Sequence, residues 1–230
     1  MKVRTLFTGM ALVGMLAAPA LASDLDNPDD RLSYTIGMDI GQSLSEQDIP
    51  LNVDLLVEGL RASYAGEPTR MTSEEALAER DAFVQRRQQE LMMQQEQEAR
   101  INQEEGEAFL ANNANNTGVE VTASGLQYRV IEEGAGNRPG PSDRVTVHYR
   151  GRLINGTQFD SSYDRGEPAT FALNQVIPGW TEGLQLMQEG ATYELFIPAE
   201  LAYGAEGRPG PIGPNSVLVF DVELIEVHSD

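Results

Sequence analysis

The stretch VTVHYRGRLINGTQFDSS, residues 145–162, carries the two patterns that decide the fold. Val145, Val147 and Tyr149 alternate with polar residues, which is the period of a β-strand that buries one face. Asn155-Gly156 follows, and this pair is a strong signal for a tight hairpin. The stretch therefore predicts two antiparallel strands joined by a short turn.

The same period of two continues on both sides, from residue 119 towards the C-terminus. Residues 126–131 are predicted to form an earlier strand, and Pro178 begins a short helix that Gly190 ends. Two later strands each place a row of apolar side chains on one face: Tyr193, Leu195 and Ile197, then Leu218, Phe220, Val222 and Leu224. We therefore expect residues 118–230 to form an α+β domain, an antiparallel sheet wrapped on one short α-helix.

Residues 23–70 carry helical patterns instead of strands. Apolar side chains recur at helical spacing in two segments: Leu32, Ile36, Ile40 and Leu44, then Val53, Leu56 and Leu60. A segment of this length is near the lower limit for a domain that folds alone. We expect it to be an all-α dimerisation domain that pairs with a second copy of the chain, because two-fold pairing is the commonest assembly. Packing back onto the C-terminal domain remains the alternative.

Residues 71–117 are predicted to form one long connecting helix. Thr72 and Glu75 fit a capping box, and neither Pro nor Gly interrupts the sequence until Gly106. Apolar residues are limited to a short row at Leu77, Val84 and Leu91 and a patch at residues 109–110, too few for a full coiled coil. We therefore expect a spacer arm with most of its surface in water.

The first 22 residues have the three parts of a secretory signal peptide. Lys2 and Arg4 precede an apolar run over residues 6–16, and Ala20-Leu21-Ala22 provides a small-residue cleavage site before Ser23. The run is short for a bilayer span, which disfavours the alternative of a retained anchor. We expect cleavage near Ala22-Ser23, export to the periplasm and no membrane span in the mature chain. Association with the outer membrane is left open.

Composition excludes several classes of protein. The chain has 230 residues, with 16 Lys and Arg against 36 Asp and Glu, no Cys and two His. The absence of Cys excludes disulfides and thiolate chemistry, and so few His leave little scope for a metal cluster. A net charge of −20 argues against nucleic-acid binding, which needs clustered Lys and Arg. We expect neither a cofactor nor a metal.

Five motifs then resemble one family in order and nearly in spacing: VTVHYRG (145–151), FDSS (159–162), VIPGW (176–180), AYG (202–204) and LVFDVEL (218–224). This is the FK506-binding protein (FKBP) family of peptidyl-prolyl cis–trans isomerases, and the resemblance covers residues 119–227. With the helices and leader before it, the chain resembles the exported bacterial Mip and FkpA subgroup. The resemblance implies a V-shaped homodimer, unfolded or proline-containing exported clients, and inhibition by macrolides of the FK506 and rapamycin type.

The resemblance also implies roles for individual residues. Trp180 is expected to form the floor under the proline ring, and Tyr203 to offer its hydroxyl to a substrate carbonyl. Asp160 is expected at the edge that faces the twisting amide, paired with Arg165, and with Tyr149 and Tyr203 it completes the catalytic candidates. The remaining expected substrate-binding residues are Phe159, Phe171, Val176, Ile177, Ile212 and Phe220.

Other interpretations stay open beside this one. Trp180 and Phe220 would be needed in the core of the domain anyway, and Asp160 could simply cap the turn at Ser161-Ser162. The rival function is a periplasmic holdase chaperone in which the pocket only binds clients. A third, a catalytically inactive dimeric adaptor, is disfavoured because no pocket position carries a disabling residue.

The sequence also departs from the small eukaryotic members of the family. Ala169 stands in place of a second pocket Phe, and the stretch from Leu173 to Val176 is two residues shorter. Arg208 and Pro211 replace a His and an Ile in the loop after the AYG motif. These changes leave the affinity for macrolides and the preferred residue before proline undetermined.

Overall fold

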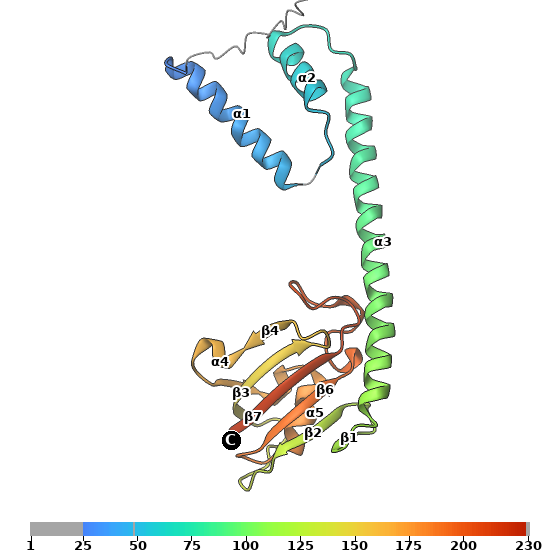
Figure 1. The fold of residues 1–230 in the computed structure, drawn as a ribbon, viewed down its shortest axis with the longest axis vertical. Coiled ribbons are helices and arrows are strands. Elements are labelled where there is room, and N and C mark those ends of the chain that lie inside the picture. The colour runs from blue at the N-terminus through green and yellow to red at the C-terminus, as the bar shows by residue number, and fades with distance from the viewer. Residues whose placement is uncertain (1–24, 48, 229–230) are drawn as a thin grey trace, which may run out of the picture. The chain divides into compact units, whose positions relative to one another are not determined.

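The computed structural model describes residues 25–47 and 49–228, and Figure 1 shows their helices and strands. The chain divides into two compact units, of which the first ends at Thr72 and the second begins at Ser73. The predicted signal peptide, residues 1–22, lies outside the described residues. No helix in the described ranges is long and apolar enough to cross a membrane.

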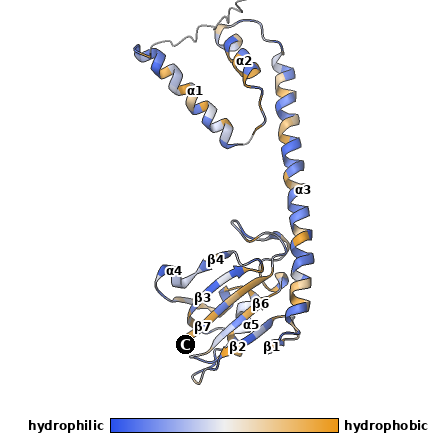
Figure 2. Ribbon diagram, viewed as in Figure 1, coloured by the Kyte–Doolittle hydropathy of each residue, from blue (hydrophilic) through white to orange (hydrophobic). Residues whose placement is uncertain are grey.

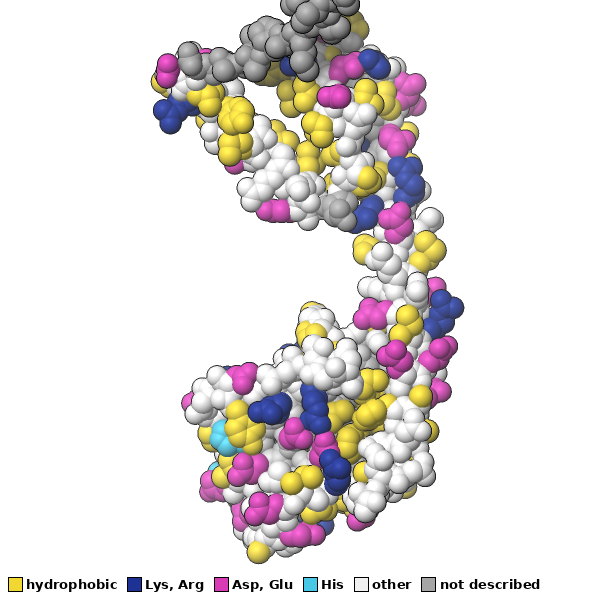
Figure 3. Space-filling view, viewed as in Figure 1, with side chains coloured by type: hydrophobic (Ala, Val, Ile, Leu, Met, Phe, Trp, Pro, Cys, Tyr) yellow, Lys and Arg dark blue, Asp and Glu magenta, His cyan; other side chains and the backbone are white. Residues whose placement is uncertain are grey.

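The first unit holds two helices, α1 (Pro28–Glu46) and α2 (Val53–Ala65), at the predicted positions. Asn52 caps α2, because its side chain accepts a hydrogen bond from the Leu55 amide, and Gly66 ends the helix with a positive φ of 68°. Apolar residues recur along both helices (Figure 2). None of the residues of α1 or α2 is buried, and the space-filling view shows hydrophobic side chains open on these helices (Figure 3).

The second unit begins with the long helix α3 (Ser73–Asn113), as predicted. Most of α3 is exposed, but its last turns pack against the sheet domain. The Phe109 ring lies 5.9 Å from that of Phe196, and Gly106 leaves room for Val217, whose Cγ2 would be 2.8 Å from an added Cβ. Asn113 donates to Gln127 at 2.9 Å. The expectation of a mostly solvated arm therefore holds for the first part of α3, whereas its end is part of the domain.

The domain is built on a seven-stranded sheet with the order β1-β2-β6-β7-β3-β4, and β5 pairs with β3. All neighbours are antiparallel. The strands are β1 (Val119–Val121), β2 (Gln127–Glu132), β3 (Arg144–Leu153), β4 (Gln158–Ser161), β5 (Ala169–Ala172), β6 (Thr192–Ile197) and β7 (Leu218–His228). The predicted hairpin joins β3 to β4, where Gly156 has a φ of 87°. The α+β prediction is confirmed.

One face of the sheet is covered by α5 (Pro178–Leu186), the predicted short helix. Two of its glycines allow a close approach to β6: an added Cβ would lie 2.3 Å from Ile197 at Gly179 and 2.8 Å from Leu195 at Gly183. The predicted inward rows form the core, and Leu195, Ile197, Leu218, Val222 and Leu224 are fully buried. Shorter elements are α4 (Ser162–Arg165), η1 (Leu173–Gln175), η2 (Ala199–Leu201) and η3 (Gly204–Glu206).

Candidate functional site

A cavity of about 450 Å³ opens beside the first turn of α5. Its centre is Trp180, which is only 4% exposed. The rings of Tyr149, Phe171 and Phe220 are nearly perpendicular to the indole, at interplanar angles of 87°, 90° and 78°. Their centroids lie 5.1, 5.4 and 5.2 Å from that of the indole. Such edge-to-face contacts fix the rings in place, so the cavity has rigid aromatic walls.

Local structure explains how Trp180 reaches this position. Pro178 occupies the start of α5, where its missing N–H is not needed, and the fixed φ of proline suits the first turn. Gly179 brings that turn against Ile197 of β6. The indole of the next residue is therefore set close to the sheet, beneath the cavity.

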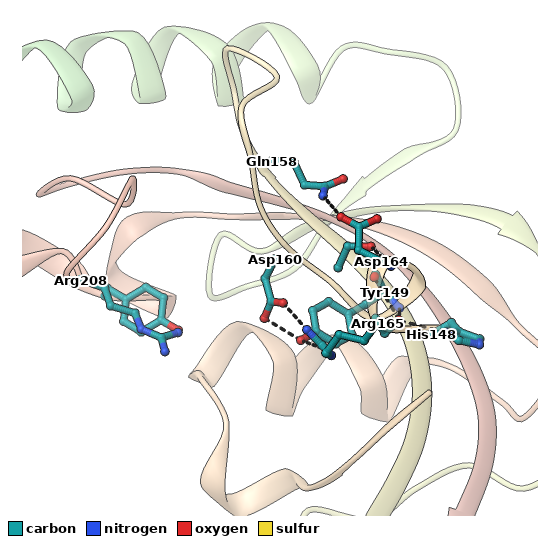
Figure 4. A network of polar contacts seen from close by, with 10 residues as sticks. His148, Tyr149, Gln158, Asp160, Asp164, Arg165 and Arg208 are labelled. Atoms are coloured by element: carbon teal, nitrogen blue, oxygen red, sulfur yellow. Dashed lines mark hydrogen bonds and ion pairs between the residues drawn. The ribbon is translucent and has the colours of Figure 1, made fainter. Parts of the chain in front are cut away.

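A polar cluster lies at one edge of the cavity (Figure 4). The Tyr149 hydroxyl donates to Asp160 Oδ2 at 2.6 Å, and Arg165 Nη1 donates to Asp160 Oδ1 at 2.6 Å. Arg165 Nη2 also donates to the Tyr149 hydroxyl at 2.9 Å. The pairing of Gly151 with Asp160 brings β3 and β4 into this register. The three side chains thus hold one another in a closed triangle of hydrogen bonds.

The turn after β4 orients this cluster. Ser161 caps α4 by accepting a hydrogen bond from the Asp164 amide, and Gly166 ends the helix with a φ of 77°. The one-turn helix directs Arg165 back towards Asp160 (Figure 4). Ser161 therefore caps α4, whereas the Asp160 carboxylate binds Tyr149 and Arg165.

The cluster fixes the charge of its members. Burial alone would raise the pKa of Asp160, but the hydrogen bonds from Tyr149 and Arg165 and the charge of Arg165 lower it below its usual value. Burial, together with the bond to Asp160, raises the pKa of Tyr149. At neutral pH Asp160 is therefore an anion and Tyr149 keeps its proton. Neither is suited to act as a mobile acid or base.

The remaining wall comes from the segments around η1 and η3. Tyr203 lines the cavity from the start of η3, and Arg208 Nη1 donates to its hydroxyl at 3.2 Å. Gln175, at the end of η1, is a further lining residue. Gln175 and Arg208 were not among the predicted site residues. The position of Gln175 directly before Val176, and the departure of Arg208 from the family pattern, were the signals available.

Most of the predicted site residues meet at this cavity: Tyr149, Phe159, Asp160, Phe171, Val176, Ile177, Trp180, Tyr203 and Phe220. Two do not line it. Arg165 acts through Asp160 and Tyr149, and Ile212 is buried in the core of the domain. Their roles in binding stay predictions. Within residues 25–47 and 49–228, no group of three or more His, Asp or Glu side chains is placed to hold a metal ion.

Comparison with known proteins gives matches over both parts of the chain. The profile of the FKBP-type peptidyl-prolyl cis-trans isomerase family matches residues 136–225, and that of the domain amino terminal to FKBP-type peptidyl-prolyl isomerase matches residues 29–130. The outer membrane protein MIP of Legionella longbeachae is 44% identical over 225 residues, covering 94% of this chain and 95% of its own.

FkpA of Escherichia coli strain K12, an FKBP-type peptidyl-prolyl cis-trans isomerase, is 41% identical over 222 residues, or 92% of this chain and 82% of its own. The crystal structure of FkpA from Escherichia coli superposes with a TM-score of 0.75 at 41% identity. That match covers 88% of this chain and 98% of the other.

Proposed function

The chain belongs to the FKBP-type peptidyl-prolyl cis–trans isomerases, enzymes that rotate Xaa-Pro peptide bonds, and we propose that it does so by holding the proline ring over Trp180. The observation that carries this proposal is the set of three rings inclined around the indole. A cavity of about 450 Å³ is in the range that binds a small ligand, which suits a proline and parts of its neighbours.

The reaction needs no nucleophile or external base. Resonance holds the amide planar against a barrier of about 18–20 kcal/mol, and the twisted amide has less charge separation than the planar one. A dry, apolar cavity therefore favours the twisted form over the planar form. Trp180 and Phe220 supply that environment, and Tyr203 donates its hydroxyl to the carbonyl of the residue before proline. Asp160, held as an anion by Arg165 and Tyr149, faces the rotating amide.

The direct test is cis-to-trans relaxation of an Xaa-Pro peptide, followed by a protease-independent method with the chain from residue 23 onwards. Asp160→Leu should lower kcat/KM by about 10- to 100-fold, since a charge-assisted hydrogen bond contributes about 1.5–3 kcal/mol. Asp164→Leu is the matched control, because Asp164 is outside the cavity and pairs with Gln158. No acceleration by the folded wild-type chain would reject the proposed catalytic function.

The N-terminal part is proposed to be a dimerisation domain, residues 23–70, joined by the connecting helix, residues 71–117, to the isomerase domain, residues 118–230. The exposed apolar rows on α1 and α2 support this, since no residue of either helix is buried. The two helices also line an apolar groove of about 410 Å³ that includes Ile40, Leu44, Leu56 and Leu60. Deletion of residues 23–70 should give monomers.

We also propose that the protein is exported and works on unfolded or proline-containing periplasmic clients. The basic, apolar and small-residue order of residues 1–22 supports a cleaved signal peptide. The similarity to a protein named as an outer membrane protein supports export and keeps outer-membrane association open. Macrolides of the FK506 and rapamycin type should compete with peptide for the aromatic cavity.

A holdase activity is the second candidate, and the aromatic cavity favours it, because such a site can bind a client without rotating its peptide bond. Two domains on one dimer would raise the effective concentration of weak client sites without new contacts. Asp160→Leu separates the two activities. Lost isomerisation with retained suppression of aggregation indicates separable functions, whereas loss of both ties client holding to the cavity.

A further inference from the structure

Arg208 brings a second guanidinium to the cavity, apart from the group formed by Asp160, Tyr149 and Arg165 (Figure 4). The two arginines differ in their partners. Arg165 is bound to Asp160, whereas no carboxylate among the described residues lies within 4.0 Å of the Arg208 guanidinium. Arg208 contacts Tyr203 instead, through the hydrogen bond to the hydroxyl and with its guanidinium carbon 5.7 Å from the ring centre.

The loop that carries Arg208 is closely tied to its surroundings. The Arg208 amide donates to the Ile212 carbonyl at 2.8 Å, and Ile212 is buried in the core. Gly207 has a φ of 66°, and a Cβ there would be 2.6 Å from the Ile212 carbonyl oxygen. The Asn215 amide donates to the Gly204 carbonyl at 2.9 Å and closes the base of the loop. The backbone of Arg208 is therefore fixed relative to the cavity.

The long helix supports the same loop from behind. Asn102 of α3 donates to the Pro214 carbonyl at 2.8 Å, and Asn215 donates to the Ala99 carbonyl at 3.2 Å. Two side-chain bonds thus join the loop to the end of α3 that belongs to the domain. The backbone of the loop is held on both sides, and the contact with Tyr203 places the Arg208 guanidinium at the cavity wall.

A guanidinium has several N–H donors in a fork that fits a carboxylate, and the bond to Tyr203 uses one of them. The remaining donors are free to bind a group on the substrate. We propose that Arg208 makes the enzyme favour substrates with an acidic residue directly before proline over substrates with its neutral isostere at that position. This rests on the proposed function, in which Tyr203 binds the carbonyl of that residue and so brings its side chain near the guanidinium.

The rest of the molecule acts against such a preference, which makes the proposal specific. The chain has a net charge of −20, so its overall field repels acidic peptides. A preference for Glu over its neutral isostere Gln therefore needs a local positive charge at the site. Arg165 cannot provide it, since its charge is balanced by Asp160.

The test compares two matched peptides, acetyl-Ala-Glu-Pro-Phe-amide and acetyl-Ala-Gln-Pro-Phe-amide, with the chain from residue 23 onwards at low salt. We expect wild-type kcat/KM to be about two- to fivefold higher for the Glu peptide, the scale of an exposed ion pair. The difference should lie in KM, because the contact is made equally before and during rotation. Arg208→Lys should keep most of the preference, Arg208→Gln should remove it and Arg208→Glu should reverse it.

Arg138→Gln is the control, since Arg138 is an exposed arginine outside the cavity. It should leave the ratio between the two peptides unchanged. A ratio of one in the wild type, or a ratio that Arg208→Gln does not alter, would overturn the proposal. So would an equal loss of rate for both peptides in Arg208→Gln, because Arg208 would then act only by holding Tyr203.

A third peptide with Leu before proline separates this inference from the function on which it rests. If the wild type does not accelerate the Leu peptide, the proposed isomerase mechanism has failed. If it accelerates the Leu peptide but shows the same Glu-to-Gln ratio as Arg208→Gln, only the role of Arg208 has failed.

Discussion

The two units of this chain carry apolar side chains in equally regular patterns but use them differently. In the sheet domain, the inward rows of β3, β6 and β7 are buried, and Val145, Val147 and Leu195 are fully so. On α1, Leu32 is 60% and Ile36 50% exposed. A regular apolar pattern therefore predicts which face of an element is to be covered, but not what covers it.

The size of each unit accounts for this difference in burial. The sheet domain joins many elements around one helix, so each inward side chain has partners on other strands. Two short helices bury far less apolar area than that, and a small unit of this kind is marginal by itself. Covering a leucine or isoleucine stabilises an assembly by about 1.5–3 kcal/mol per side chain. A second copy of the same surface is the simplest source of that cover.

The largest expected effect comes from placing charge on the exposed row of α1. Ile36→Asp together with Ile40→Asp should raise the dissociation constant of the proposed dimer by roughly 100-fold or more, because buried unpaired carboxylates cost several kcal/mol. Sedimentation across a range of concentrations would measure this. Gln42→Glu, which adds a charge on another face of α1, is the control. A double variant that remains dimeric would remove these residues from the interface.

The next prediction concerns the boundary between the arm and the domain. A fragment of residues 118–230 should be about 2–4 kcal/mol less stable to urea than one beginning at Ser73. It lacks the contact of Phe109 with Phe196, the contact of Gly106 with Val217 and the bond from Asn113 to Gln127. Phe109→Ala in the longer fragment should reproduce part of the loss. Val84→Ala, at an exposed position of the same helix, is the matched control.

Equal stability of the two fragments would show that α3 adds nothing to the domain. This result would restore the interpretation of residues 71–117 as a separate arm. It would also mean that the end of α3 is not needed to hold the loop that carries Arg208.

The boundary between α3 and the sheet domain shows which features could be predicted from the sequence and which could not. The helices and strands were predictable because their apolar residues repeat at a regular spacing within one short stretch of sequence. The aromatic cavity was predictable because its residues occur in recognisable motifs. The contact between Phe109 and Phe196 joins distant parts of the chain, so the sequence showed Phe109 only as an isolated patch. Arg208 reaches the cavity through a loop conformation that depends on Gly207 and Ile212. A loop of this kind has no repeating sequence pattern from which its conformation could be predicted.

A smaller effect is expected on the sheet face opposite the cavity, where Glu194 lies between two arginines. Its side chain is 8% exposed and pairs with Arg129 and Arg152, which also pairs with Asp221. Glu194→Gln should cost about 2–3 kcal/mol of unfolding free energy, since Arg129 and Arg152 would both lose the carboxylate that they share. The arginines are partly exposed, which keeps the loss below that of a fully buried pair.

Asp221→Asn is the matched control for this network, because its carboxylate is much more exposed and should contribute about 0–1 kcal/mol. Neither change should alter kcat/KM for a peptide, since neither residue lines the cavity. Urea unfolding and the peptide assay measure the two quantities on the same samples. A loss of activity in folded Glu194→Gln would show that the outer face of the sheet influences the site.

The smallest expected effect is on pH dependence, where the cavity should show almost none near neutrality. The pKa of Asp160 is lowered in the folded protein, so the unfolded chain binds more protons at this site than the folded chain does. The resulting stabilisation is fully present above the unfolded pKa of about 3.9 and is lost as pH falls through the folded pKa. Both kcat/KM and this part of the stability should therefore be constant from about pH 8 to about pH 5.

Isomerisation rates measured by NMR exchange between about pH 4 and pH 8, together with carboxyl ¹³C shifts, would check this prediction. Asp160→Asn should show a lower but equally flat profile, because the titrating carboxyl is absent. His148→Gln is the matched control, because His148 bonds Ser162 near the cluster but does not line the cavity. An inflection between about pH 5 and pH 8 that survives His148→Gln would show that the triangle of Tyr149, Asp160 and Arg165 does not hold Asp160 as an anion during catalysis.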